Sequence, residues 1–278
     1  GFLYPIYGNW VWGGGWLFQL KDSAIGRPYV DFAGSGVVHA VGGVAALAGA
    51  IVVGPRIGKF NADGSANTIP GHHIPMAMLG TFILLFGWFG FNAASTFAVT
   101  DIQFATVAAN TAIAGAFGAI VSMLWITKRT GKPDPGMMAN GMLAGLVAVT
   151  APCAFIDPWA AAVIGIIAGI LVVFSVEFVE KRGIDDAVGA ISVHGVCGAF
   201  GTICVGLFAS QDVEGFWSQG LLLGGGPDQL ISQLIGIASV AAWVSVCSLA
   251  LFYGLKYTIG LRVGEDEEPL ASARRGGI

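Results

Sequence analysis

The sequence predicts an all-α polytopic membrane protein, on three observations. The 278-residue chain is 55% hydrophobic and only 11% charged, whereas about a quarter of the residues in soluble domains are charged. It contains 43 glycines, roughly twice the usual share, and small residues let helices pack closely inside a membrane. The third observation is a series of long stretches that contain no Asp, Glu, Lys or Arg.

Seven such uncharged stretches follow one another along the chain, and each holds 19 to 27 residues. A helix needs about 20 residues to cross the hydrocarbon core of a bilayer, so each stretch predicts one transmembrane helix. The predicted helices lie within residues 32–55, 74–100, 102–127, 135–156, 158–176, 187–211 and 229–255.

The first 20 residues are also uncharged, but they contain Pro5 and three consecutive glycines at 13–15. Such residues interrupt helices, so this stretch is predicted to be the end of a truncated helix and its exit loop. Three regions are therefore expected. Residues 1–29 form the helix end and an extracellular loop, residues 30–260 a membrane domain of seven helices, and residues 261–278 a cytoplasmic tail.

The basic residues predict the orientation, because cytoplasmic loops carry an excess of Lys and Arg. Eleven of the 13 basic residues, Arg274 and Arg275 among them, fall in alternate connections and at the C-terminal end; only Lys21 and Arg27 fall on the other side. The C-terminus is therefore predicted to be cytoplasmic, at the plasma or inner membrane of the cell. The net charge of −4 is too small to indicate a nucleic-acid partner.

One motif occurs twice. Residues 31–43 read DFAGSGVVHAVGG and residues 186–198 read DAVGAISVHGVCG, so that six of 13 positions are identical without a gap. The identities pair Asp31 with Asp186 and His39 with His194. Ionisable residues inside a membrane are costly and by default mark a transport path, so the two histidines are predicted to be functional.

The spacing within the motif predicts where the histidines lie. Eight residues of helix rise about 12 Å, which places each histidine near the middle of a hydrocarbon core about 30 Å thick. The predicted topology brings the two histidines to the midplane from opposite faces, as in an inverted-repeat transporter. Asp31 is expected to cap its helix, with room for an electrostatic role at the outer mouth, and Asp186 is expected to be structural.

No metal site is expected. The four cysteines are Cys153, Cys197, Cys204 and Cys247; they lack the spacing of metal ligands and are predicted to be small buried hydrophobic residues.

The motifs resemble those of the ammonium transporter family (Amt/Mep/Rh), and of its Amt branch in particular. Residues 31–39 resemble the family's fifth-helix motif, 87–95 (GWFGFNAAS) the sixth and 194–198 (HGVCG) the tenth; residues 11–15 (VWGGG) resemble the segment before the fifth helix, and 260–263 (GLRV) the start of the tail. The resemblance implies an eleven-helix inverted repeat, of which helices five to eleven and the end of the fourth are present here. It also implies a homotrimer with one pore per subunit.

The resemblance implies roles for further residues. Trp12 matches the outer tryptophan that recruits ammonium, whose aromatic face attracts a cation, and Ser95 matches the hydroxyl acceptor at that site. Phe91 matches the pore gate below it, whose phenyl partner would lie in the preceding helices. Trp88 and Asn92 are expected to line or support the pore, with a packing role as the alternative.

These roles imply a mechanism. A charged ion in an apolar path bears a large desolvation cost, so ammonium is expected to lose its proton on entry and to pass His39 and His194 as the neutral amine. The two imidazoles can share a hydrogen bond. Whether the pair also carries the proton, which would make transport electrogenic, is left open. Neither an enzymatic activity nor a cofactor is expected.

Three alternatives are kept. An ammonium sensor would join this module to a cytoplasmic signalling domain. A redox enzyme would hold haem between the two histidines, although such enzymes commonly need two histidine pairs. A gas channel of the Rh type would pass ammonia without current. For a bacterial protein, the resemblance also implies a PII-type regulatory protein on the cytoplasmic face.

Overall fold

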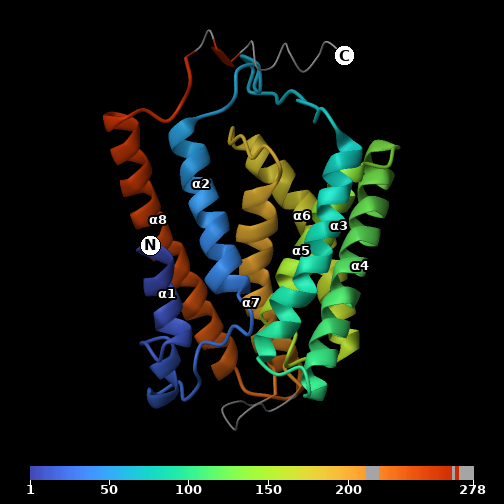
Figure 1. The fold of residues 1–278 in the computed structure, drawn as a ribbon, viewed down its shortest axis with the longest axis vertical. Coiled ribbons are helices and arrows are strands. Elements are labelled where there is room, and N and C mark those ends of the chain that lie inside the picture. The colour runs from blue at the N-terminus through green and yellow to red at the C-terminus, as the bar shows by residue number, and fades with distance from the viewer. Residues whose placement is uncertain (211–218, 265–266, 269–278) are drawn as a thin grey trace.

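The computed structural model describes residues 1–210, 219–264 and 267–268, which form a bundle of roughly aligned helices (Figure 1). The predicted tail residues Arg274 and Arg275 lie outside this described part. Within it, the regular structure is helical, apart from one isolated bridge between Phe60 and Ala66. The predicted all-α fold class is therefore confirmed.

The helices follow the predicted order. The α-helices are α1 (Leu3–Trp12), α2 (Val41–Val53), α3 (Ile74–Trp88), α4 (Ile102–Thr130), α5 (Pro135–Thr150), α6 (Pro158–Lys181), α7 (Cys197–Phe208) and α8 (Asp228–Thr258). Three π-helical segments adjoin them: η2 (Ser35–Ala40) runs into α2, η3 (Phe89–Ala93) continues α3, and η5 (Ile191–Val196) runs into α7. Short 3₁₀ segments are η1 (Phe18–Asp22), η4 (Ala94–Thr96) and η6 (Leu221–Leu223).

Six stretches of the described chain are long and apolar enough to cross a membrane: Ser35–Val53, Ile74–Thr96, Ile102–Thr130, Pro158–Lys181, Ile191–Phe208 and Asp228–Thr258. The seventh predicted span corresponds to α5, which has 16 residues and is shorter than the others. It is short because the chain leaves the helix after Thr150 and continues to Ile156 as a buried turn. The helix thus lies within the predicted residues 135–156 and ends at Thr150.

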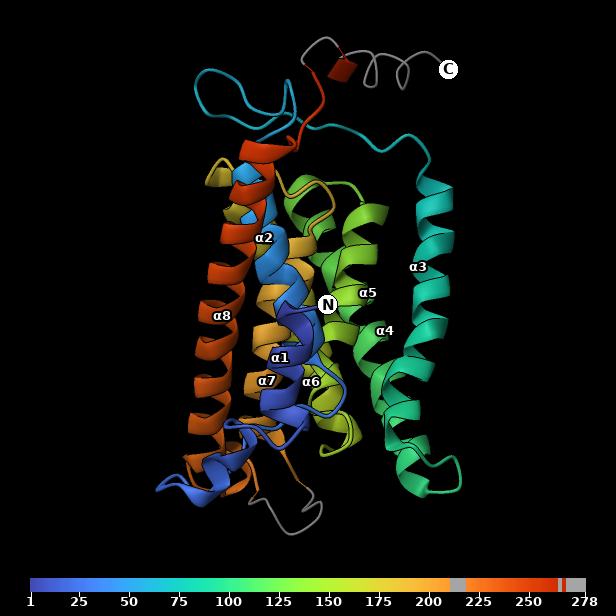
Figure 2. The ribbon, with the colours of Figure 1, turned by 60° about the vertical axis from the view of Figure 1, so that its left-hand side comes forward.

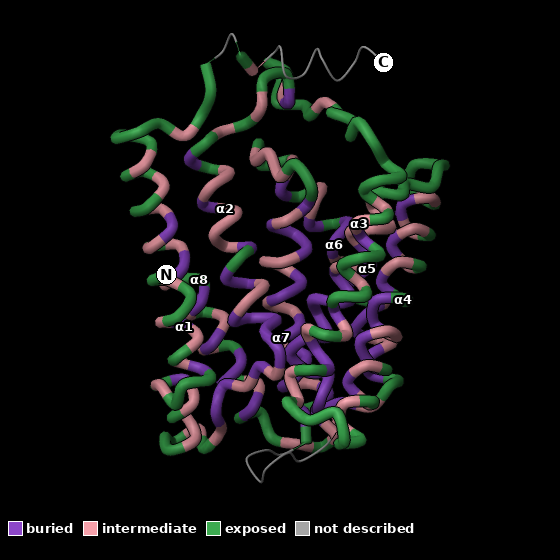
Figure 3. Tube along the Cα trace, in the orientation of Figure 1, coloured by how far each residue is buried: buried purple, intermediate pink, exposed green. Residues whose placement is uncertain are grey.

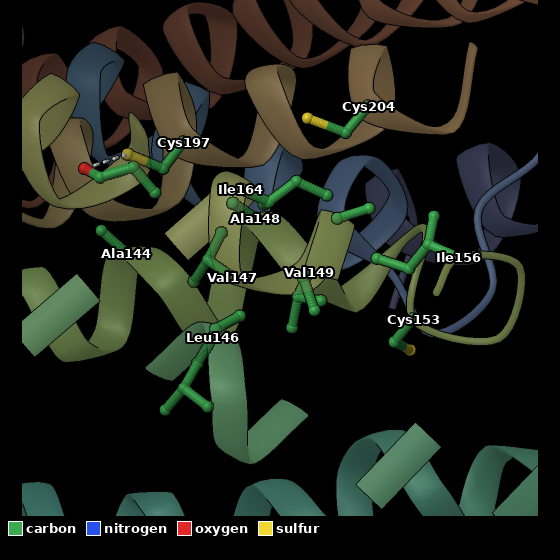
Figure 4. Close-up of a cluster of buried hydrophobic side chains, with 14 of the residues drawn as sticks. Ala144, Leu146, Val147, Ala148, Val149, Cys153, Ile156, Ile164, Cys197 and Cys204 are labelled. Carbon is green, nitrogen blue, oxygen red and sulfur yellow. Dashed lines mark hydrogen bonds between the residues drawn. The ribbon is translucent and has the colours of Figure 1, made fainter. Parts of the chain in front are cut away.

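The core lies where α4, α5 and α6 meet, and Figure 4 shows its central side chains on α5, α6 and α7. Backbones touch directly in this region. A Cβ added to Gly118 of α4 would lie 2.2 Å from the Gly141 carbonyl oxygen, and one added to Gly165 of α6 would lie 2.4 Å from that of Ala114. Such contacts leave no room for a side chain, which explains part of the high glycine content.

The predicted burial of the cysteines holds for three of the four. Cys153, Cys197 and Cys204 are buried in the core cluster (Figure 4), whereas Cys247 of α8 is partly exposed. The exception follows from the position of α8, which packs on the outside of the bundle and has a largely exposed surface (Figure 3).

The surface of α3 is strongly apolar and exposed. The helix stands apart from α1 and α8 in Figure 2, and only 11% of its most apolar stretch is buried. Its large exposed side chains include Phe82, Ile83 and Phe86. A surface of this kind is expected where a helix faces lipid or further transmembrane helices, both of which are as apolar as the helix itself.

Charged contacts in the described chain gather at one end of the bundle. The ion pairs there join Arg56 to Asp185, Lys59 to Glu180, Arg129 to Glu177 and Arg262 to Glu268. These residues lie in, or in the helix ends next to, the connections that the Lys and Arg count assigns to the cytoplasmic side. The four basic residues of these ion pairs are therefore all ones that the sequence analysis counts on the same side.

Candidate functional site

The two histidines of the repeated motif are in contact. The Nδ1 atoms of His39 and His194 lie 3.1 Å apart, and the rings are stacked with centroids 5.1 Å apart and an angle of 18° between their planes. A hydrogen bond at this distance requires that one Nδ1 carries a proton and the other does not. The pair therefore contains one imidazole in each tautomer when both are neutral.

Glycines of the same motif bring the two histidine-bearing segments together. The helices α2 and α7 run in opposite directions (Figure 1). A Cβ added to Gly43 would lie 2.0 Å from the Gly195 nitrogen, and one added to the repeat-related Gly198 would lie 2.5 Å from the Ser35 carbonyl oxygen. Backbone contact on both sides of the histidines explains why glycine recurs at the last position of the motif.

The route by which His39 reaches the interior differs from the prediction. Asp31 does not start a continuous α-helix, because residues 27–34 are not helical and Gly34 has a φ of 121°. His39 lies in the π-helical η2, near the beginning of the span Ser35–Val53 rather than at its middle. The helical stretch begins well inside the bundle (Figure 1), so the non-helical segment, not eight residues of helical rise, carries the histidine inward. Short π-helical segments are frequent at functional sites.

Asp31 holds the start of this segment. It is only 3% exposed, and its two carboxylate oxygens accept hydrogen bonds of 2.8–2.9 Å from the backbone N–H groups of four consecutive residues: Gly34, Ser35, Gly36 and Val37. The first four N–H groups of a helix have no partner within the helix, and a negative charge there is favourable. Asp31 therefore fixes the beginning of η2 and, with it, the position of His39.

Asp186 has the corresponding place in the second repeat. Its Oδ2 accepts hydrogen bonds from the backbone N–H groups of Ile191 at 2.9 Å and Ser192 at 3.4 Å, both in η5. It is partly buried and binds fewer donors than Asp31 does. Both acids of the repeat thus act on the backbone at the start of a histidine-bearing segment.

Two aromatic residues surround His39. The Trp88 ring stacks on the imidazole with centroids 5.1 Å apart and an angle of 14°, and the Phe91 ring meets it edge-on at 5.5 Å. The Trp88 Nε1 donates a hydrogen bond of 3.0 Å to the Thr150 hydroxyl. The His39 Nε2 is buried and has no hydrogen-bond partner in the described part of the chain.

An outer pocket of about 320 Å³ lies beside the non-helical segment. Trp12 lines it and is 48% exposed, while its Nε1 donates a hydrogen bond of 2.8 Å to the Asp31 carbonyl oxygen. The other lining residues are Val11, Gly14, Phe18, Pro28, Tyr29, Val30, Asp31, Phe32 and Phe155. The indole is therefore half-exposed beside the pocket, and its N–H group already has a hydrogen-bond partner.

Ser95 and Asn92 lie on the η3–η4 segment. The Ser95 hydroxyl donates a hydrogen bond of 2.6 Å to the Phe91 carbonyl oxygen, and Ser95 is not among the residues that line the outer pocket. Asn92 is fully buried and its Nδ2 donates a hydrogen bond of 3.0 Å to the Thr111 hydroxyl of α4. Asn92 therefore attaches η3 to α4 through this hydrogen bond.

Polar residues that the sequence analysis did not single out connect the elements of the site. The Ser35 hydroxyl donates a hydrogen bond of 2.6 Å to the Val147 carbonyl oxygen and accepts one of 2.6 Å from the Ala151 nitrogen. Thr150 holds Trp88, and Thr111 holds Asn92. Single Ser and Thr residues are common in membrane helices, so only the tertiary contacts reveal these roles. No group of metal-binding side chains was found within the described residues.

These observations define a polytopic α-helical membrane protein with a histidine pair where two copies of one motif, carried by antiparallel helices, meet. The model of the Ammonium Transporter Family matches residues 1–274, and the chain belongs to this family.

The relatives agree with this assignment. The chain is 48% identical over 277 residues to Ammonium transporter Amt2 of Archaeoglobus fulgidus, covering 96% of this chain and 59% of that protein. It is 41% identical to Ammonium transporter Amt1 of Haloferax mediterranei, of which it covers 52%. The chain thus spans between half and three fifths of the length of these curated relatives.

Solved structures share the fold. A structure described as "Sensor Amt Protein" superimposes with a TM-score of 0.87 at 40% identity and covers 96% of this chain and 65% of that one. The crystal structure of Candida albicans Mep2 superimposes with a TM-score of 0.83 at 30% identity and covers 95% and 58%.

Proposed function

We propose that this chain forms the histidine-bearing part of a transmembrane ammonium transporter. The observation that supports this most directly is the His39–His194 pair, which two antiparallel, repeat-related segments hold inside a member of the ammonium transporter family. Because the relatives are longer than this chain, the transporting unit is the natural full-length protein. Its substrate is ammonium or ammonia, and it performs no enzymatic reaction.

Recruitment takes place at the outer pocket. The half-exposed Trp12 face attracts the cation, and the Asp31 carboxylate adds a negative charge behind the pocket wall. Ser95 does not line this pocket; its proton is donated to the Phe91 carbonyl oxygen, so its lone pairs offer an acceptor beside the gate rather than in the pocket. Ammonium and K⁺ are similar in size, but only ammonium donates hydrogen bonds, so the site selects by chemistry rather than by size.

Deprotonation follows at the aromatic residues. Phe91 and Trp88 pack against His39 and form an apolar entrance that a charged ion enters at a large desolvation cost. Phe91 acts as a gate: ammonium gives its proton to the buried Nε2 of His39, and the neutral amine passes the gate. Trp88 lines the path, whereas Asn92 and Asp186 hold the surrounding backbone.

The histidine pair receives the neutral amine. The buried Nε2 of His39 is a free donor or acceptor, depending on the tautomer, and the Nδ1–Nδ1 contact couples its tautomer to that of His194. A proton that enters one ring leaves from the other when the shared hydrogen bond reverses. The pair therefore relays the proton along with the amine, and transport is electrogenic.

The assembly and orientation belong to the same proposal. The protein is a homotrimer in the cell membrane, with its C-terminus and its ion-paired end in the cytoplasm, and in a bacterium a PII-type regulatory protein binds that face. The orientation is supported by the concentration of Arg and Lys at one end of the bundle, since cytoplasmic loops carry that excess.

A second candidate is an ammonium sensor, favoured by the similarity to the structure described as "Sensor Amt Protein". The two candidates differ in flux. The full-length protein in liposomes should produce a current without protein-dependent internal alkalinisation after an ammonium pulse, because the proton enters together with the amine, and no current after a K⁺ pulse. Alkalinisation without current would indicate a gas channel, and ammonium binding without any flux would favour the sensor.

A further inference from the structure

The outer segment 27–34 has an unusual setting. It is not helical, yet Tyr29, Asp31 and Ala33 in it are buried. Backbone N–H and C=O groups in the interior of a membrane protein need partners, because water does not reach them there. The N–H groups of Tyr29, Phe32 and Ala33 donate to backbone carbonyl oxygens of other segments, and side chains from neighbouring helices supply partners for other backbone groups of the segment.

One face of α8 supplies side-chain hydrogen-bond partners for this segment. The Ser232 hydroxyl donates to the Arg27 carbonyl oxygen at 2.7 Å, and the Gln229 Nε2 donates to the Pro28 carbonyl oxygen at 3.0 Å. Gln233 contacts the next part of the segment. Residues spaced by three and four lie on one face of a helix, so these three side chains follow the segment as it runs past α8.

Gln233 makes the fullest contact of the three. Its Oε1 accepts a hydrogen bond of 2.9 Å from the Val30 nitrogen, and its Nε2 donates one of 2.7 Å to the Val30 carbonyl oxygen. The side-chain amide thus pairs with both backbone groups of one residue, as a neighbouring β-strand would. The Nε2 also donates to the Thr202 carbonyl oxygen of α7 at 2.9 Å, and the Oε1 accepts from Gln229 at 3.1 Å.

All four hydrogen-bonding positions of this amide are therefore occupied, and Gln233 is fully buried. Val30 directly precedes Asp31, whose carbonyl oxygen holds Trp12 and whose carboxylate holds η2. Gln233 itself does not line the outer pocket, whereas Val30 does. The hydrogen bonds of Gln233 to Val30 therefore fix part of the pocket wall, although Gln233 does not reach the pocket.

We propose that Gln233 is a positioning residue for the outer ammonium site: its amide clamps Val30 and ties that wall to α7, the helix that follows His194. The expected effect on ammonium rests on the proposed transport function. The contact between Gln233 and Val30 does not depend on that function. Since Gln233 does not line the pocket, its loss should weaken recruitment of ammonium more than it slows the later steps.

The test uses Gln233→Met in the full-length protein, because methionine has a similar length and forms no comparable hydrogen bonds. Gln103→Met on α4, far along the chain from this segment, is the matched control. Amide hydrogen exchange should show Val30 protected in the wild type and exchanging roughly tenfold faster or more in Gln233→Met. The KM for ammonium should rise roughly fivefold, the effect of losing hydrogen bonds of ordinary strength, with a smaller change in maximal rate.

Gln233→Glu is a second variant that preserves the size of the side chain. A carboxyl group has at most one proton to donate, so it serves either Val30 or Thr202 but not both, and intermediate exchange and KM values are expected. Unchanged protection and KM in both variants would overturn the inference, as would a Val30 amide that exchanges freely in the wild type. Absence of ammonium flux in the wild type would refute the proposed function, while the exchange data would still decide on the clamp.

Discussion

Gly43 and Gly195 meet backbone to backbone beside the histidine pair: a Cβ on Gly43 would lie 2.0 Å from the Gly195 nitrogen and 2.3 Å from its Cα. Neither atom belongs to a flexible side chain, so a larger residue at position 43 has to push two helical segments apart. The distance between the histidine-bearing segments therefore depends on this contact.

Gly43→Ala should separate the two segments and lower both stability and transport. Overpacking of a tight contact costs about 1–3 kcal/mol, which thermal unfolding in detergent can measure. Gly42→Ala is a matched control, because a Cβ at Gly42 meets nothing within 4 Å. Equal melting temperatures for the two variants would show that the Gly43 contact is not tight.

Asp31→Asn should destabilise the protein more than Asp186→Asn does. An asparagine offers one acceptor oxygen where the carboxylate offers two, so two of the four N–H groups bound by Asp31 would lose their acceptor. Buried unsatisfied donors cost about 1–3 kcal/mol each. Asp186 is less buried and binds through one oxygen, and a remaining amide oxygen can serve its donors. If denaturation experiments show similar losses in the free energy of unfolding for both variants, Asp31 does not stabilise its segment more than Asp186 does.

Trp12→Leu should raise the KM for ammonium while changing the maximal rate less. A cation–π contact contributes about 0.5–2 kcal/mol, which corresponds to a rise of roughly two- to thirtyfold. Trp16→Leu provides the control, because Trp16 is similarly exposed but does not line the outer pocket. A KM that responds equally to both substitutions would exclude a specific role for Trp12.

Acid should weaken the Arg56–Asp185 ion pair at the end of the bundle. Burial of the Asp185 carboxyl opposes its ionisation, but the hydrogen bonds from Arg56 outweigh this effect and hold the pKa of Asp185 below its ordinary value of 3.8. The pair therefore contributes its full stability above about pH 4 and loses it as the pH falls through the lowered pKa.

The measurement is the difference in melting temperature between the wild type and Arg56→Gln. We expect a clear difference at pH 7 that narrows below pH 4, whereas the exposed Lys128→Gln should behave like the wild type throughout. A difference that stays constant down to pH 3 would mean that Arg56 acts through packing rather than through the charge of Asp185.

Hydropathy was sufficient to predict the order of the membrane helices, because the cost of charge in a bilayer acts on each segment separately. The repeat in turn predicted the contact between His39 and His194, since it paired the residues and the topology set their directions. Hydropathy did not place the end of α5 within residues 135–156, because the residues after Thr150 are as apolar as the helix itself.

Features that depend on tertiary contact were not visible in the pattern. Periodicity does not distinguish the π-helical η2 from an ordinary helix start, so the path of His39 into the bundle was predicted wrongly. The Gln233 clamp lies more than 200 residues along the chain from the segment it holds, and a glutamine in a membrane helix does not identify its partner. Residues 211–218, 265–266 and 269–278 fall outside the described structure.

The most direct test of the central claim is the ammonium-evoked current of the full-length protein with His39→Ala and, separately, His194→Ala. The proton relay needs both rings, because the shared Nδ1 hydrogen bond is lost when either is removed. Each variant should therefore lose most of the ammonium-selective current while remaining folded and present in the membrane. Undiminished, ammonium-selective current in both variants would contradict the assignment of the histidine pair as the centre of transport.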